Sequence, residues 1–116
     1  MPDLDFALMR MVHSTWALKV RAFLNGSQQI DPNDLISYRD CDLGKWLYSA
    51  GLTKYSEMKE IQELEQAHKS MHDLVKRIVD LKRAGKAHDA AQEFLRMHEL
   101  SKEVVALLTR MEQYTH

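Results

Sequence analysis

Residues 61–79, IQELEQAHKSMHDLVKRIV, decide the fold of this chain. Spacings of three and four along this stretch link Ile61, Leu64, His68, Met71, Val75 and Ile78. This period places five apolar side chains and one imidazole on a single face of an α-helix. We predict a long helix that Thr53 caps, that continues to about Ala84 and that stops at Gly85 after a cationic last turn.

Two further segments show the same period. A first helix is predicted from about residue 3 to residue 25, with its main stripe at Phe6, Met9, His13, Trp16, Val20 and Phe23. A second apolar stripe runs beside it, at Leu4, Leu8, Met11, Thr15, Leu18 and Ala22. A last helix is predicted over residues 87–114, with its stripe at Ala90, Phe94, Met97, Ser101, Val104, Leu108 and Met111. Because the first helix is apolar over a wide arc, we expect it to contact more than one neighbour.

Two short helices are predicted between the first two long ones. The first covers residues 31–38, because Asp31 can cap a helix and Pro32 suits the first helical position. The second covers residues 40–49, with Gly51 as its stop. Three long and two short helices predict an all-α fold that resembles a four-helix bundle. The length of 116 residues predicts that residues 1–116 form one domain.

The composition excludes several classes of protein. Lys and Arg total 16 and Asp and Glu total 17, so we expect no basic surface for nucleic acid or for an anionic membrane. No apolar run reaches the roughly 18–20 residues that span a bilayer, so we expect no membrane insertion. Acids at Asp3 and Asp5 stand where a secretory signal carries bases, which predicts a cytoplasmic location. The single cysteine, Cys41, excludes an internal disulfide.

The histidines of the long helices indicate a metal site. His68 and His72 are four residues apart, which puts both imidazoles on one helix face and suits two ligands of one metal ion. That spacing alone is a weak signal. His13 and His68 both occupy core positions of their helices, so two long helices could bring them together. Either histidine alone is also compatible with a core residue that is bonded to a backbone carbonyl.

The segment around Cys41 adds a candidate sulfur ligand. Cys41 stands at the start of a short helix, where unpaired N–H groups and the helix dipole favour thiolate over thiol. The alternative is a small buried hydrophobic residue, which is common for cysteine. Gly44 has no side chain and is expected to let another helix approach closely. Trp46 is expected to anchor the short helix on the bundle.

These residues together suggest one zinc site between three helices. A full tetrahedral ligand set for Zn²⁺ is formed by His13, Cys41, His68 and His72. Four protein ligands leave no open position for an activated water, which favours a structural or sensing site over zinc hydrolysis. His98 is the main rival ligand, and we expect it to be a boundary residue. Glu65 could orient the imidazole of His68, or it could be an ordinary solvated residue.

Three motifs resemble elements of a known family. They are His13-Ser14-Thr15-Trp16, Cys41-Asp42-Leu43-Gly44-Lys45-Trp46 and Ala67-His68-Lys69-Ser70-Met71-His72. In this order and at these separations, the chain resembles the CZB family, the chemoreceptor zinc-binding domains of bacteria, with its H-x-x-W, C-x-(Leu/Phe)-G-x-W and A-H-x-x-x-H elements. The last helix carries no matching element.

The resemblance implies more than the residues alone. It implies zinc binding by His13, Cys41, His68 and His72, a homodimeric helical bundle, and a regulatory role. Members of the family are attached to cytoplasmic chemoreceptors or to diguanylate cyclases, where zinc occupancy or oxidation of the zinc-bound cysteine alters the output. The chain of 116 residues has no room for such an output module. We therefore expect either a free-standing sensor or one domain of a longer protein.

The leading hypothesis is a zinc-binding regulatory sensor, not an enzyme, in which Cys41 is a candidate for redox sensing. The first alternative is a small metal-dependent redox enzyme, for which Glu65-Gln66-Ala67-His68 supplies one Glu-x-x-His motif without a mate. The second alternative is a metal-free helical interaction domain. The surplus apolar stripe of the first helix predicts a homodimer.

Overall fold

The computed structural model describes residues 5–27, residue 30 and residues 37–115. Within these ranges every regular element is helical, so the all-α prediction is confirmed. The long helices are α1 (Phe6–Leu24), α4 (Lys59–Arg83) and α5 (Ala87–Thr115). Between α1 and α4 lie α2 (Asp42–Trp46), the π-helical turn η2 (Leu47–Gly51) and α3 (Leu52–Lys54).

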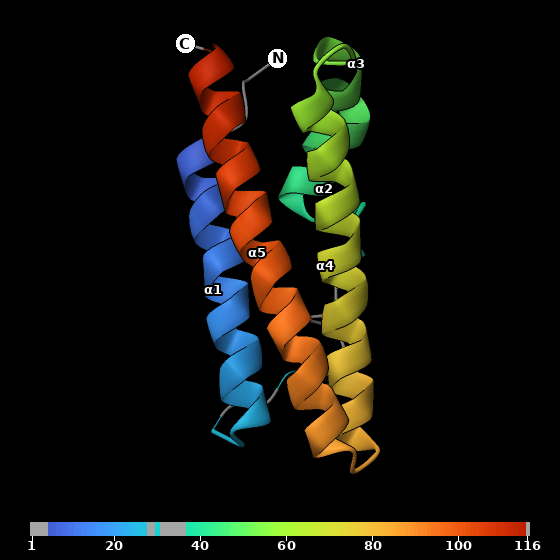
Figure 1. Ribbon diagram of the computed structural model, residues 1–116. Helices are drawn as coiled ribbons and strands as arrows, with labels where there is room; N and C mark the ends of the chain where they lie inside the picture. Colours follow the sequence, from blue (N-terminus) through green and yellow to red (C-terminus); the bar gives the residue numbers. More distant parts are fainter. Residues whose placement is uncertain (1–4, 28–29, 31–36, 116) are drawn as a thin grey trace.

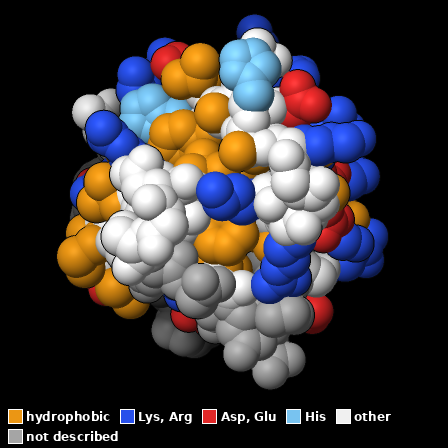
Figure 2. Space-filling view, turned by 90° about the horizontal axis from the view of Figure 1, so that it is seen from below, with side chains coloured by type: hydrophobic (Ala, Val, Ile, Leu, Met, Phe, Trp, Pro, Cys, Tyr) orange, Lys and Arg blue, Asp and Glu red, His pale blue; other side chains and the backbone are white. Residues whose placement is uncertain are grey.

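The long helices form an elongated bundle of 45 × 23 × 19 Å. Helix α5 packs against both α4 and α1, and α1 begins at the end of the bundle where α5 finishes (Figure 1). The predicted stripe of α4 is buried at all six positions, and α1 and α5 bury theirs except for the half-buried Trp16 and Phe94. At the end where α4 and α5 join, hydrophobic side chains gather near the centre, among Lys and Arg side chains (Figure 2). The helical period therefore identified the core correctly.

Most ends of the long helices follow from local chemistry. The Asp5 carboxylate caps α1 by accepting a hydrogen bond of 3.0 Å from the Leu8 N–H, so α1 begins two to three residues later than predicted. Gly26 and Gly85 have φ angles of +79° and +81°, a left-handed conformation that favours glycine. Both glycines follow the ends of helices, and Gly85 is the predicted stop of α4.

Two predicted boundaries are wrong. Gly51 does not stop a helix: it lies in η2, and the chain continues helically to Lys54. A Cβ atom on Gly51 would lie 2.6 Å from the Trp46 ring, so the glycine permits close packing instead of termination. Thr53 caps nothing, because it lies inside α3 and α4 begins after Met58, which makes no side-chain cap.

The short helix predicted at residues 31–38 falls largely on residues 31–36, which lie outside the described residues. Tyr38 itself lies in a turn that continues through Asp40. The second short helix begins at Asp42, two residues later than predicted, and runs through the π turn beyond its predicted end at Ser49. One continuous helical segment, residues 42–54, therefore takes the place of a ten-residue helix.

Segment 42–54 bridges α1 and α4. The ring of Trp46 packs edge-on against Phe6 of α1, with 6.1 Å between ring centres, and lies 6.0 Å from the ring of Tyr55. Leu43 and Leu47 on the same segment are fully buried. This short segment takes the place of a fourth helix in the bundle. Figure 1 shows α2 beside the middle of α4. The residue before α2, Cys41, lies with its sulfur 3.1 Å from Nε2 of His68 on α4.

None of the helices in the described ranges combines the length and the apolar character needed to cross a membrane.

Candidate metal centre

Four potential metal ligands meet in the middle of the bundle. One ligand atom from each residue lies within 4.8 Å of all the others, and the four residues are His13, Cys41, His68 and His72. His13 comes from α1, Cys41 precedes α2, and the other two come from α4. The structure therefore brings together all four residues that the sequence singled out.

The spacing of the donor atoms suits a tetrahedral metal ion. His68 Nε2 lies 3.1 Å from the sulfur of Cys41 and 3.0 Å from His72 Nε2. Zinc–nitrogen bonds of about 2.0–2.1 Å place two imidazole nitrogens of a tetrahedral site about 3.3–3.4 Å apart. These two pairs would move apart by a few tenths of an ångström around Zn²⁺, and any pair near the 4.8 Å limit of the set would move closer by about 1 Å.

His13 is held in the form that a metal requires. Its side chain is 3 % exposed, and its Nδ1–H donates a hydrogen bond of 2.8 Å to the carbonyl oxygen of Met9. That bond leaves Nε2 with its lone pair as the nitrogen for coordination. Burial lowers the pKa of His13, so the ring is neutral at pH 7.

His68 is the most deeply buried of the four. It is 1 % exposed, and burial, followed by the neighbouring His72 and His13, lowers its pKa to about 3. Its Nδ1 atom has no hydrogen-bond partner among the described residues. A buried polar ring of this kind is costly unless its other nitrogen makes a strong bond. Nε2 is the nitrogen that faces the other donors, the Cys41 sulfur at 3.1 Å and His72 Nε2 at 3.0 Å. A cation shared by these three donors would give the buried ring a strong bond at Nε2, so the residues present fit a metal ion.

Cys41 corrects one step of the sequence argument. Its sulfur caps α2 by accepting the Gly44 N–H at 3.4 Å, as a residue at a helix start does. Burial nevertheless raises the pKa of the thiol, and it outweighs the lowering by the N–H groups of Gly44 and Leu43. The start of the helix therefore does not give a thiolate by itself. A bound cation would supply the missing stabilisation of the anion.

Gly44 serves a contact different from the predicted one. A Cβ atom there would overlap the carbonyl oxygen of Tyr38, in the turn just before Cys41. The close approach is therefore made by this turn and not by another helix. Trp46 anchors the segment on the bundle, as predicted, through Phe6 and Tyr55.

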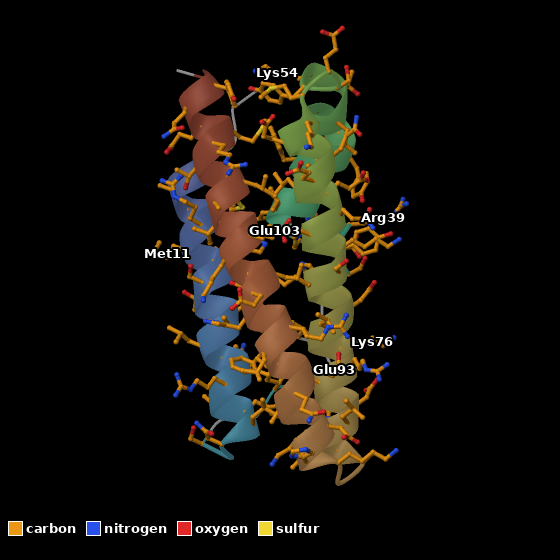
Figure 3. The ribbon with its side chains drawn as sticks, viewed as in Figure 1. Met11, Arg39, Lys54, Lys76, Glu93 and Glu103 are labelled. Carbon is orange, nitrogen blue, oxygen red and sulfur yellow. The ribbon has the colours of Figure 1, made fainter. Side chains whose placement is uncertain are left out.

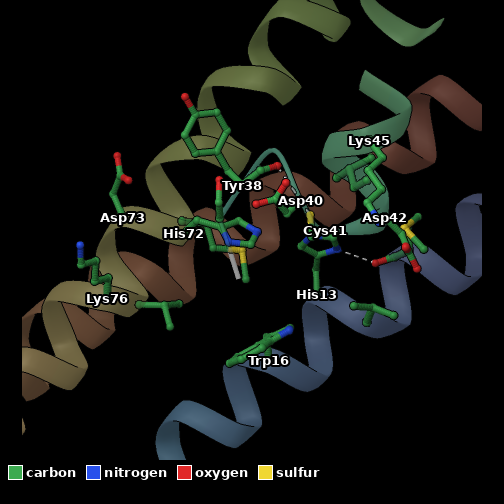
Figure 4. A pocket seen from close by; sticks show the side chains of 16 residues that line it. His13, Trp16, Tyr38, Asp40, Cys41, Asp42, Lys45, His72, Asp73 and Lys76 are labelled. Carbon is green, nitrogen blue, oxygen red and sulfur yellow. Dashed lines mark hydrogen bonds between the residues drawn. The ribbon is translucent and has the colours of Figure 1, made fainter. Parts of the chain in front are cut away.

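A cleft of about 750 Å³ runs along one side of the cluster (Figure 4). His13, Cys41 and His72 line it, whereas His68 lies behind them. Trp16, one turn after His13, is half-buried in its wall and has the ammonium of Lys19 at 5.0 Å from its ring centre. The remaining charged lining residues are Asp40, Asp42, Lys45, Asp73 and Lys76. The cleft gives small molecules a route to the sulfur.

The other candidates lie outside the cluster. His98 is exposed, and its ring stacks on that of Phe94 with 6.0 Å between centres, so it is not a ligand of this cluster; it is more exposed than the predicted boundary residue. Glu65 lies near the hydroxyl of Tyr48, whose pKa burial and then this carboxylate raise to about 12, and it does not bond to His68. Sequence reasoning missed the orienting role of the Met9 carbonyl. The spacing of four residues between Met9 and His13 was its only signal.

Comparison with known proteins agrees with this geometry. The family model of the chemoreceptor zinc-binding domain (CZB) matches residues 13–79, which is more than half of the chain. The chain belongs to the CZB family. The matched range contains all four clustered residues and ends within α4. No curated protein and no solved structure matches the chain.

Proposed function

We propose that this CZB domain is a zinc-binding regulatory sensor in bacterial signalling. The observation that supports this most is the meeting of three imidazoles and one thiol within 4.8 Å. Zn²⁺ accepts this donor set in tetrahedral sites whose four positions are all filled by protein. Such a site stabilises structure and leaves no position for an activated water. The cluster also contains no carboxylate, which a di-iron enzyme would require.

The proposed signal is a change in how the segment from Cys41 to Lys54 is held. His13 lies on α1 and His68 and His72 lie on α4, so coordination would tie the segment to both long helices through Cys41. Loss of the metal, or oxidation of the sulfur, would remove that tie. Hypochlorous acid, for example, oxidises a thiolate to a sulfenic acid and is reduced to chloride. The released segment would be the two-state element that biases an output.

The proposal also covers the output module that the domain controls and its location in the cell. A chemoreceptor or a diguanylate cyclase would receive the change, either in the same longer protein or as a separate partner. We place the domain in the cytoplasm, where reducing conditions keep a single thiol such as Cys41 free. Neither nucleic acid nor a bilayer is among the proposed partners.

Metal analysis tests the proposal directly. We expect one zinc ion per chain in protein purified without chelator, and its removal should speed amide hydrogen exchange in residues 41–54. Residues 97–111 of α5 pack in the core without a ligand of the cluster, so their exchange should change little. Protein without stoichiometric zinc, or equal exchange in both segments before and after chelation, would contradict the proposal.

We also propose that the domain forms a homodimer through α1. Leu8, Met11 and Leu18 on its second stripe are 42 %, 60 % and 66 % exposed, which is unusual for three large apolar side chains on one helix. Sedimentation velocity at micromolar concentration should show a dimer. Leu18→Glu should shift it to monomer, whereas Leu95→Glu, at an equally exposed leucine on α5, should not. If the wild-type protein were a monomer, the proposed dimer would be refuted, and the proposed zinc site would not be affected by that result.

A further inference from the structure

A cluster of aromatic and charged side chains lies beside the turn that carries Cys41. The guanidinium of Arg39 lies 5.0 Å from the ring centre of Tyr48 and 5.7 Å from that of Tyr38, and the two rings are 6.1 Å apart. The two distances from the guanidinium to the ring centres are short enough for cation–π interactions. Figure 3 labels Arg39 at the outer edge of the molecule, beyond α4. The turn before α2 is thus joined to η2, which follows α2.

The same cluster is joined to α4. The ammonium of Lys69 lies 5.5 Å from the ring centre of Tyr38, and Glu65 lies close enough to the Tyr48 hydroxyl to raise, after burial, the pKa of Tyr48 to about 12. Glu65 and Lys69 are one helical turn apart and lie on either side of His68 in the sequence. We call these five residues the Tyr38 cluster: Tyr38, Arg39, Tyr48, Glu65 and Lys69.

The position of Tyr38 is coupled closely to that of the Cys41 sulfur. In the metal-free thiol form, Cys41 donates to the Tyr38 carbonyl oxygen at 3.8 Å. That oxygen also packs where Gly44 has no side chain, a contact that does not depend on the protonation of the sulfur. The Ser37 carbonyl accepts hydrogen bonds from the N–H groups of Asp40 at 3.0 Å and Cys41 at 3.3 Å. The turn is therefore compact, and a shift of Tyr38 would move the sulfur.

We propose that Arg39 and Tyr48 are positioning residues that set how readily the Cys41 sulfur leaves the metal centre. The inference rests on the proposed zinc site and adds to it a regulatory contact. The Tyr38 cluster joins the turn to α4 at the surface, and its members are exposed or half-buried. The hydrophobic anchor Trp46 packs on α1 instead. The cluster can therefore open without disturbing the core, and opening it carries the sulfur away from His68.

Zinc transfer to excess 4-(2-pyridylazo)resorcinol tests this inference. We expect Arg39→Ala and Tyr48→Leu each to release zinc about three- to tenfold faster, the size of one or two exposed cation–π contacts. Their effects should combine to less than the product, because both remove the same contact. Arg39→Lys, which keeps a cation, should recover part of the wild-type rate. Arg110→Ala, at an exposed position of α5, is the matched control.

Two further readouts separate positioning from general stability. A merely structural role would lower the free energy of unfolding of the zinc-free protein and leave zinc release unchanged. If wild-type protein holds zinc and Arg39→Ala releases it at the wild-type rate, the inference is overturned while the proposed function stands. If wild-type protein holds no zinc, the proposed function fails first. In zinc-loaded protein, Cys41 of Arg39→Ala should also react several-fold faster with 5,5′-dithiobis(2-nitrobenzoate) than Cys41 of the wild type, and equal rates would overturn the inference.

Discussion

Replacing Cys41 with serine should weaken zinc binding by about 10²- to 10³-fold. Structural zinc sites of four ligands bind with about 10–16 kcal/mol, so one ligand contributes about 3–4 kcal/mol if the four share this energy equally. Cys41 also supplies the only sulfur and the negative charge of the set. Competition with a chelator of known zinc affinity measures the loss. The His72→Ala variant should show a loss of similar size.

The choice of serine separates metal loss from misfolding. The sulfur of Cys41 accepts the Gly44 N–H at 3.4 Å and so caps α2, and a serine hydroxyl can accept the same hydrogen bond. Cys41→Ala removes the cap as well, so it should add a small loss of stability to the same loss of zinc. His98→Ala, at an exposed histidine on α5, should keep wild-type affinity. Wild-type affinity in both Cys41 variants would exclude the centre described here.

Substitution with Co²⁺ gives a second measurement on the same variants. A tetrahedral site with a thiolate should show a strong sulfur-to-cobalt absorption in the wild type. This band should be absent in Cys41→Ser and present in His98→Ala. A wild-type spectrum typical of octahedral cobalt would show that the four residues do not surround the ion.

The long helices and the four residues of the cluster could be predicted from the sequence. Their core stripes repeat every three to four residues, and this period reports directly which face is buried. His13 and His68 each replace an apolar residue in such a stripe, and both are buried in the structure. A buried imidazole at a core position is informative because it is costly without partners.

The errors arose where packing contacts override the signals of single residues. Gly51 and Thr53 carry typical stop and cap chemistry, yet packing of the Trp46 ring on Gly51 keeps that segment helical. The effect of burial on the Cys41 thiol depends on how α2 sits on α4, which no local pattern reports. The Tyr38 cluster joins residues 38–48 to residues 65–69, and its members resemble ordinary surface residues in the sequence.

Acid should destabilise the zinc-free protein steeply. His68 has a pKa of about 3 in the folded chain against an ordinary value of 6.5, and burial lowers the pKa of His13 as well. Between pH 6.5 and about 3 the unfolded chain therefore binds a proton at His68 that the folded chain does not. The stability from this ring is fully present above pH 6.5 and is lost as the pH falls. The loss is about 1.4 kcal/mol for each pH unit below 6.5, so about 2 kcal/mol at pH 5 from His68 alone.

Urea unfolding at pH 7.5 and pH 5 measures this effect, and variants assign it. His68→Leu keeps an apolar side chain of similar size at the core position and removes the titrating ring. It should therefore lose about 2 kcal/mol less than the wild type between the two pH values. His98→Ala is the control, because its ring is exposed, and it should keep the full pH dependence. If His68→Leu showed the same fall in stability as the wild type, His68 would not be buried as a neutral ring. The description of His68 as a neutral ring that can coordinate a metal would then be wrong, since coordination needs a deprotonated nitrogen.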